Sequence, residues 1–200
     1  MAPADARDAR AAVRIGPLRT VANDITAVRT VASVAVAVAA LVTGSLGLLA
    51  AAYGVYWLGD VLDGLAARRL GQETRVGAVL DIVGDRACTA VLCTGLVSLV
   101  PGVAIVALVF LPSFLVLDTM LSLAFLCWPL LGPNDFHLVD RRVWALNWSP
   151  PAKAANTAGV IGAVAFGQYT LALGVALAVL AVKLWSAAAM ARLLSRDGRP

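Results

Sequence analysis

Long apolar stretches are the feature of this sequence that most restricts its fold. Each of six stretches comes close to the roughly 20 residues that an α-helix needs to cross a bilayer. They cover residues 25–49, 51–70, 76–100, 103–131, 153–169 and 171–194. Hydrophobic residues make up 60% of the chain and charged residues 14%, which is too apolar for a soluble domain. The sequence therefore predicts an all-α polytopic membrane protein with six transmembrane helices.

The basic residues predict how these helices are oriented. Lys and Arg gather near the start of the chain, around the turn after residue 68, in the polar segment 132–151 and near the end. The turns near Ala50, Pro101 and Thr170 hold none. The positive-inside rule then places both termini and the turn after residue 68 on the cytoplasmic side. We expect an integral protein of a bacterial cytoplasmic membrane.

The net charge of +4 raises the question of an acidic partner. Nucleic acid is not expected, because the basic residues form no patch interleaved with aromatic side chains; a membrane surface fits better. Near the N-terminus Arg7, Arg10 and Arg14 recur at helical spacing. They predict a juxtamembrane amphipathic helix within residues 1–24, ahead of a membrane domain over 25–200. A partly disordered basic leader is the alternative for residues 1–12.

Four aspartates interrupt the apolar sequence at helical spacing. Asp60 and Asp63 stand at i, i+3, and Asp81 and Asp85 at i, i+4, so each pair shares one helix face. A polar turn containing Gly71 separates the pairs, and a helical hairpin would bring the two acidic faces together. Clustered carboxylates repel one another unless cations lie between them, and oxygen ligands suit Mg²⁺, Mn²⁺ or Ca²⁺. The alternative is a buried charge network that only stabilises the helix pair.

Eight residues in this region carry a family resemblance. Their spacing is D-x2-D-G-x2-A-R-x8-G-x3-D-x3-D, formed by Asp60, Asp63, Gly64, Ala67, Arg68, Gly77, Asp81 and Asp85. This pattern resembles the signature of the CDP-alcohol phosphotransferase family at every fixed position. An Asn23-x2-Thr26-x2-Arg29 sequence also resembles the opening of the first membrane helix in many members. The resemblance implies a membrane enzyme with six helices.

The resemblance also implies roles for the eight residues. It implies a site for two divalent cations, Mg²⁺ or Mn²⁺, held by Asp60, Asp63, Asp81 and Asp85, with Asp85 as the base that activates an acceptor alcohol. The CDP group would be bound by residues between and beside these aspartates. These are Gly64, Ala67, Arg68 and Gly77. The physics alone does not say which carboxylate is the base.

The acceptor is less constrained by the sequence. Phosphatidylglycerophosphate and phosphatidylinositol-phosphate synthases carry basic residues in the fourth span, whereas residues 115–120 here contain none. An acceptor phosphate would then be met by Arg75 or by the candidates Arg141, Arg142 and Lys153.

Asp118, an acid within the fourth span, has two interpretations. It either lines the acceptor cavity, with Lys183 as a partner, or forms a structural ion pair with that lysine.

The predicted function is transfer of a phosphatidyl group from CDP-diacylglycerol to a small polar alcohol, with release of CMP. Glycerol 3-phosphate is the first choice of acceptor, which would make the chain similar to phosphatidylglycerophosphate synthases. Inositol phosphate, or another CDP-alcohol specificity, is the alternative within the family. A divalent-cation carrier using the same carboxylates is the alternative from another class. Expected partners are these substrates, membrane lipid and, as one option, a second copy in a homodimer.

Overall fold

The computed structural model describes residues 15–197, without the side chains at 157, 158, 196 and 197, and these residues are helical with short connections. They form two compact units. The first unit comprises residues 15–99 and 123–132, and the second comprises residues 100–122 and 133–197. The predicted amphipathic helix falls mostly on residues 1–14, which lie outside the described residues.

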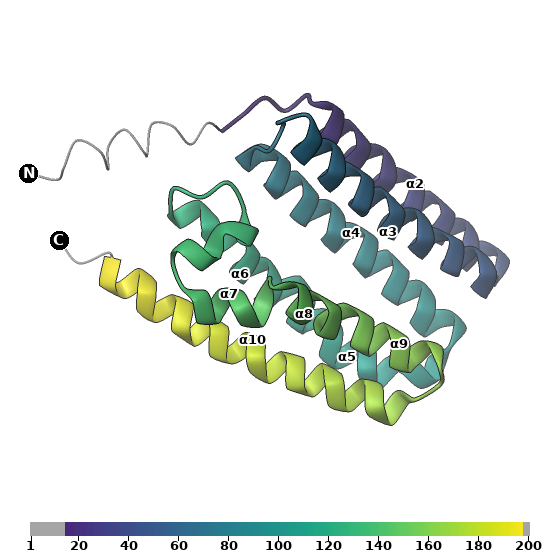
Figure 1. Cartoon of the computed structure of the whole chain (residues 1–200). Helices are drawn as coiled ribbons and strands as arrows, with labels where there is room; N and C mark the ends of the chain where they lie inside the picture. Colours follow the sequence, from purple (N-terminus) through teal and green to yellow (C-terminus); the bar gives the residue numbers. More distant parts are fainter. Residues whose placement is uncertain (1–14, 198–200) are drawn as a thin grey trace, which may run out of the picture. The chain divides into compact units, whose positions relative to one another are not determined.

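Three long helices, α2, α3 and α4, run side by side in the first unit (Figure 1). They are α2 (Val21–Thr43), α3 (Leu46–Arg69) and α4 (Arg75–Leu99). The Thr20 hydroxyl caps α2 by accepting the Asn23 N–H at 3.1 Å. Such a cap satisfies one of the backbone donors that the first turn of a helix leaves open.

The boundary between the first two helices differs from the prediction. Gly44 has φ +64° and ends α2 in the left-handed conformation, and the Ser45 hydroxyl then caps α3 by accepting the Leu48 N–H at 3.3 Å. The predicted boundary between residues 49 and 51 is therefore wrong. Gly44 and Ser45 form the turn itself, and both lie inside the apolar stretch that was assigned to one helix.

The turn between α3 and α4 confirms the predicted hairpin. Gly71 has φ +61°, a conformation that glycine adopts without a Cβ penalty, and the next N–H, of Gln72, donates to the Ala67 carbonyl at 2.8 Å. The Thr74 hydroxyl accepts the Gly77 N–H at 3.0 Å, which caps the first turn of α4. The chain reverses within five residues, 70–74, so both acidic pairs lie near the same end of the hairpin.

Small side chains form the core among these three helices. Ala37 and Ala40 of α2, Ala52 of α3 and Cys88 of α4 are completely buried, and Leu49 and Leu92 complete the cluster. The Ser33 hydroxyl adds an interhelical hydrogen bond to the Ala52 carbonyl at 2.9 Å. Small residues let helices approach closely, which holds the acidic faces in register.

Residues 123–132 join the first unit through Arg75. Its guanidinium donates to the carbonyls of Phe125, Leu126 and Trp128 at 3.4, 3.0 and 2.8 Å, and its guanidinium carbon lies 5.8 Å from the Phe125 ring centroid. Arg75 thereby satisfies carbonyls that the ending 3-10 helix leaves open.

The fourth predicted span is an irregular helix. It runs through 3-10 helix η1 (Pro101–Val103), α5 (Ala104–Pro112), π-helix η2 (Ser113–Asp118), α6 (Thr119–Leu123) and 3-10 helix η3 (Ala124–Cys127). The irregularity begins at Pro112, because proline has no N–H to donate, and a π-helix starts directly after it.

The rest of the second unit packs around α10 (Tyr169–Asp197). Its other elements are 3-10 helix η4 (Pro133–Leu138), α7 (Arg141–Asn147), α8 (Pro150–Lys153), π-helix η5 (Ala154–Ala158) and α9 (Gly159–Ala165). Apolar side chains of α5, α9 and α10 form its core, which contains Val106, Val160, Ala163, Ala172 and Ala176. In Figure 1 α9 and α10 run antiparallel across a short turn.

Three described helical segments are long and apolar enough to cross a membrane by length and composition alone. These are Val21–Thr43, Pro101–Cys127 and Tyr169–Ser195. Helices α3 and α4 have comparable lengths but carry the charged motif, and residues 150–165 form a helix of only about 24 Å at 1.5 Å per residue. The polytopic membrane character thus agrees with the structure, and the count of six spans stays a prediction.

Candidate metal and nucleotide site

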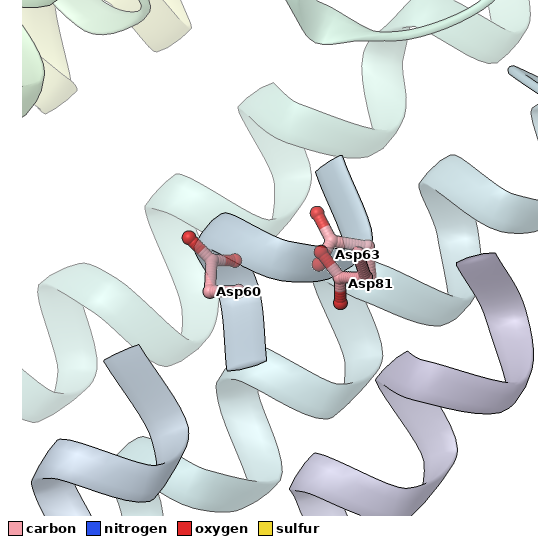
Figure 2. Close-up of side chains that lie close together, drawn as sticks. All are labelled: Asp60, Asp63 and Asp81. Atoms are coloured by element: carbon pink, nitrogen blue, oxygen red, sulfur yellow. The ribbon is translucent and has the colours of Figure 1, made fainter. Parts of the chain in front are cut away.

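Three aspartates converge between α3 and α4. Carboxylate oxygens of Asp60, Asp63 and Asp81 all lie within 4.8 Å of one another (Figure 2). Oxygens that share one hard cation at about 2.0 to 2.5 Å fall within roughly this separation of one another. The three side chains therefore fit a Mg²⁺ or Mn²⁺ ion in donor type and spacing.

Arg29 of α2 joins all four motif aspartates in one ion-pair network. Its Nε donates to Asp63 Oδ2 at 2.7 Å. One terminal nitrogen, NH2, lies 2.5 Å from Asp81 Oδ1, 3.1 Å from Asp85 Oδ1 and 3.3 Å from Asp60 Oδ1. Asp85 is outside the group of three that converges for a metal, and this guanidinium connects it to that group.

The side chain of Arg29 is closed to solvent, whereas its partners Asp60 and Asp81 are partly exposed. Its side chain is 2% exposed, and Gly59 of α3 lies so close that an added Cβ would come within 2.7 Å of Arg29 Cδ. The Thr26 hydroxyl, one turn earlier on α2, donates to Asp63 Oδ2 at 2.7 Å. The Tyr56 ring centroid lies 5.4 Å from the guanidinium carbon, within cation–π range. Burial at this depth makes each charge depend strongly on its partners.

One donor of Arg29 has no partner. Its NH1 nitrogen is buried and makes no hydrogen bond to any part of the chain that the structure describes. An unsatisfied buried donor is unfavourable by about 1 to 3 kcal/mol, and by more when it belongs to a charged group. The arrangement therefore has an unused donor beside the carboxylates, as expected of a binding site.

The motif glycine Gly77 serves the packing of α4 against α2. A Cβ at Gly77 would stand 2.8 Å from Asn23 Oδ1 and 3.0 Å from Thr74 Oγ1, both tighter than ordinary contacts. Gly84, which is outside the motif, meets Thr30 Oγ1 at 2.7 Å in the same way. These two glycines let the polar face of α2 reach the acidic hairpin.

The motif pair Gly64 and Arg68 lies together on α3. Both Arg68 terminal nitrogens approach the position that a Gly64 Cβ would occupy, at 3.2 and 3.6 Å. Arg68 is exposed, and Gly64 and Ala67 are half-buried. The Arg68 guanidinium is thus accessible to a ligand, as a role in nucleotide binding requires.

Three of the cations predicted to bind an acceptor phosphate lie exposed in the second unit. Arg141 and Arg142 are exposed at the start of α7, and Lys153 is exposed and donates to Asn134 Oδ1 at 2.8 Å. Arg75, the other cation considered for an acceptor phosphate, instead donates to backbone carbonyls of the first unit.

Asp118 forms an ion pair with Lys183 of α10, the partner that both interpretations of the sequence named. Lys183 is 3% exposed and also donates to Asn147 Oδ1 at 2.9 Å. Asn147 in turn donates to Ser186 Oγ at 2.8 Å. This polar network links η2, α7 and α10 inside the second unit.

Sequence reasoning missed Arg29 as a site residue. It noticed Arg29 only as the last position of the Asn23-x2-Thr26-x2-Arg29 pattern, although all three residues turn out to be buried on the face of α2 that contacts the hairpin. A signal was available in this pattern. A buried arginine in an apolar helix needs an acidic partner, and the motif aspartates are the nearest acids in an adjacent helix.

Comparisons with known proteins agree with the geometry of this site. Residues 19–190 match the family model described as CDP-alcohol phosphatidyltransferase. CDP-diacylglycerol--inositol 3-phosphatidyltransferase of Candida albicans is 49% identical over 49 residues, which are 24% of this chain and 21% of that protein. The match thus spans about a fifth of the length of that relative. No solved structure gives a significant match.

Proposed function

The chain belongs to the CDP-alcohol phosphatidyltransferase family of membrane transferases in phospholipid synthesis, and on that premise we propose that it transfers a phosphatidyl group from CDP-diacylglycerol to a small polar alcohol. CMP is the second product. The observation that carries this proposal is the convergence of Asp60, Asp63 and Asp81 from two successive helices at the motif spacing.

The bond changes assign work to particular side chains. An acceptor hydroxyl oxygen forms a bond to the phosphorus that carries diacylglycerol, and the bond from that phosphorus to the CMP oxygen breaks. Asp85 accepts the hydroxyl proton, and Arg68 donates hydrogen bonds to the diphosphate. Divalent cations bound by Asp60, Asp63 and Asp81 would neutralise the diphosphate and the departing CMP. Asp85 is also the fourth predicted metal ligand, and the guanidinium that it shares with the other three supports its place in the same site.

The preferred acceptor is glycerol 3-phosphate. The exposed arginines Arg141 and Arg142, with Lys153 nearby in sequence, offer charge-assisted hydrogen bonds to a phosphate. The ion pair of Asp118 with Lys183 supports a structural role for that acid. Inositol is the second candidate acceptor, because the partial match to an inositol phosphatidyltransferase favours it.

Metal-dependent release of CMP from CDP-diacylglycerol by the purified chain tests the activity. The assay runs with glycerol 3-phosphate, inositol, inositol phosphate or no acceptor, and with Mg²⁺, Mn²⁺ or a chelator. We expect CMP release only with metal and one acceptor. If only inositol supports CMP release, inositol replaces glycerol 3-phosphate as the assigned acceptor. If no acceptor supports CMP release, the proposed activity is refuted.

Neutralising the cations of the second unit tests the acceptor assignment. Arg141→Gln with Arg142→Gln should raise the KM for glycerol 3-phosphate about tenfold or more and leave the KM for CDP-diacylglycerol unchanged. Arg69→Gln, which removes an exposed charge at the end of α3, is the matched control. Equal KM values for glycerol 3-phosphate in the double variant and the control would remove these arginines from the acceptor site.

The cation-carrier alternative is disfavoured by Arg29. A guanidinium that pairs with all four carboxylates places a fixed positive charge where a carrier would pass a divalent cation. The motif positions Gly64 and Arg68 also have no use in ion passage. Metal uptake into vesicles containing the chain, in the absence of CDP-diacylglycerol, would support the carrier instead.

A further inference from the structure

We propose that Arg29 is an exchangeable internal counter-ion: its guanidinium holds the four carboxylates together before metal binds, and divalent cations bind in competition with it. This inference rests on the metal site of the proposed function. It adds a positioning residue from α2 to a motif that lies entirely on α3 and α4. It also predicts that metal and Arg29 substitute for one another in stabilising the first unit.

The first observation is that the guanidinium and the candidate metal use the same carboxylates. All three aspartates whose oxygens converge within 4.8 Å are ion-paired with Arg29. Its NH2 alone contacts Asp60, Asp81 and Asp85, which belong to both helices of the hairpin. A divalent cation that binds to these aspartates would therefore approach the positive charge of Arg29, which is already paired with the same carboxylates.

The second observation concerns charge and burial. When all four aspartates are ionised they carry four negative charges, and Arg29 supplies one positive charge within ion-pair distance of all of them. Carboxylates this close repel one another, and Arg29 together with Arg86, whose charge acts on Asp85, still leaves a net negative charge that attracts divalent cations. The same guanidinium opposes those cations by like-charge repulsion.

The third observation is that the aliphatic stem of Arg29 is held in place, while its guanidinium keeps one hydrogen-bond donor unused. Gly59 admits its side chain against the backbone of α3, and Tyr56 faces the guanidinium. Its NH1 has no hydrogen-bond partner among the described residues. A purely structural arginine buried this deeply would be expected to use that donor, whereas an arginine that shifts as ligands bind needs donors in reserve.

Thermal unfolding of the full chain in detergent, followed by tryptophan fluorescence, tests the exchange. The wild type, Arg29→Gln and the control Arg69→Gln are compared with a chelator and with saturating MnCl₂, without nucleotide. Arg29→Gln should unfold at a lower temperature than wild type in chelator. Its rise in Tm on adding Mn²⁺ should exceed the wild-type rise by roughly 3 °C or more, which corresponds to about tenfold tighter binding.

The possible outcomes separate this inference from the proposed function. Equal Mn²⁺-induced rises in wild type and Arg29→Gln would overturn the exchange, because a merely structural arginine lowers Tm equally with and without metal. Failure to recover folded Arg29→Gln even when it is purified in MnCl₂ would also overturn it, since metal would then not replace the guanidinium. Absence of any Mn²⁺ effect on both the wild type and Arg29→Gln would instead refute the metal site itself. The control Arg69→Gln should behave as wild type.

Discussion

Replacing Lys183 with methionine should destabilise the second unit by about 3 to 5 kcal/mol, because it removes one member of a buried ion pair. Lys183 is 3% exposed and its partner Asp118 is 14% exposed, so water replaces little of the lost interaction. The ammonium also donates to Asn147 Oδ1 at 2.9 Å, and a charge-assisted hydrogen bond of this kind contributes about 1.5 to 3 kcal/mol of the total.

A second lysine in the same unit provides a matched control. Lys153 also donates to an asparagine, Asn134, at 2.8 Å, but it is exposed. Lys153→Met should therefore change stability by no more than about 0.5 kcal/mol. The measurement is chemical unfolding of the detergent-solubilised protein, compared among wild type and the two lysine variants.

A double variant tests whether the network of Lys183 is structural. Lys183→Met combined with Asp118→Leu replaces the ion pair with apolar groups and should recover most of the stability that the single variant loses. Its KM for the acceptor should equal that of the wild type. Equal stability of the Lys183→Met and Lys153→Met variants would refute the reasoning, and a large rise in acceptor KM in the double variant would give Asp118 the acceptor role instead.

Three further predictions address the base, the packing of the motif and the topology. Asp85→Asn should lower kcat by at least about 100-fold with little change in binding of CDP-diacylglycerol, and near-normal turnover in the CMP assay would contradict its role as base. Gly77→Val should lower stability by about 1 to 3 kcal/mol in thermal unfolding, because its side chain would displace Asn23; unchanged stability would contradict the close packing. In a variant without native cysteines, Gln168→Cys should react with an impermeant thiol reagent from outside and Glu73→Cys only after the membrane is opened, and the reverse pattern would contradict the orientation.

The hairpin could be predicted because its determinants are local. The spacing of the aspartates places each pair on one helix face. A glycine such as Gly71 in a polar segment indicates a turn, because glycine readily adopts the left-handed conformation found there. The boundary between the first two helices, at Gly44, could not be predicted in this way because its local sequence is ambiguous. Small residues in an apolar segment suit both a tight turn and a helix-packing surface, and only the contacts of the folded chain decide between them.

Local sequence patterns do not show that α2 contributes Arg29 to the site. Arg29 lies far along the chain from Asp60 and Asp81, and no periodicity relates the two regions. What brings them together is the packing of α2 against the hairpin, which depends on Gly59 and Gly77 having no side chains. This long-range contact depends on how the helices pack, so a sequence motif within one segment identifies only some of the residues of the site.

The composition of the site explains why three helices are needed where the motif occupies two. Aspartates on α3 and α4 alone would repel each other across the hairpin in the absence of metal, and this repulsion would favour separation of the two helices. Arg29 opposes that separation with one guanidinium that contacts carboxylates of both helices. Since the same group also limits how tightly cations bind, the chain can keep its ligands assembled while metal, nucleotide and product enter and leave. A site held together by metal alone would lose its geometry each time the metal departed.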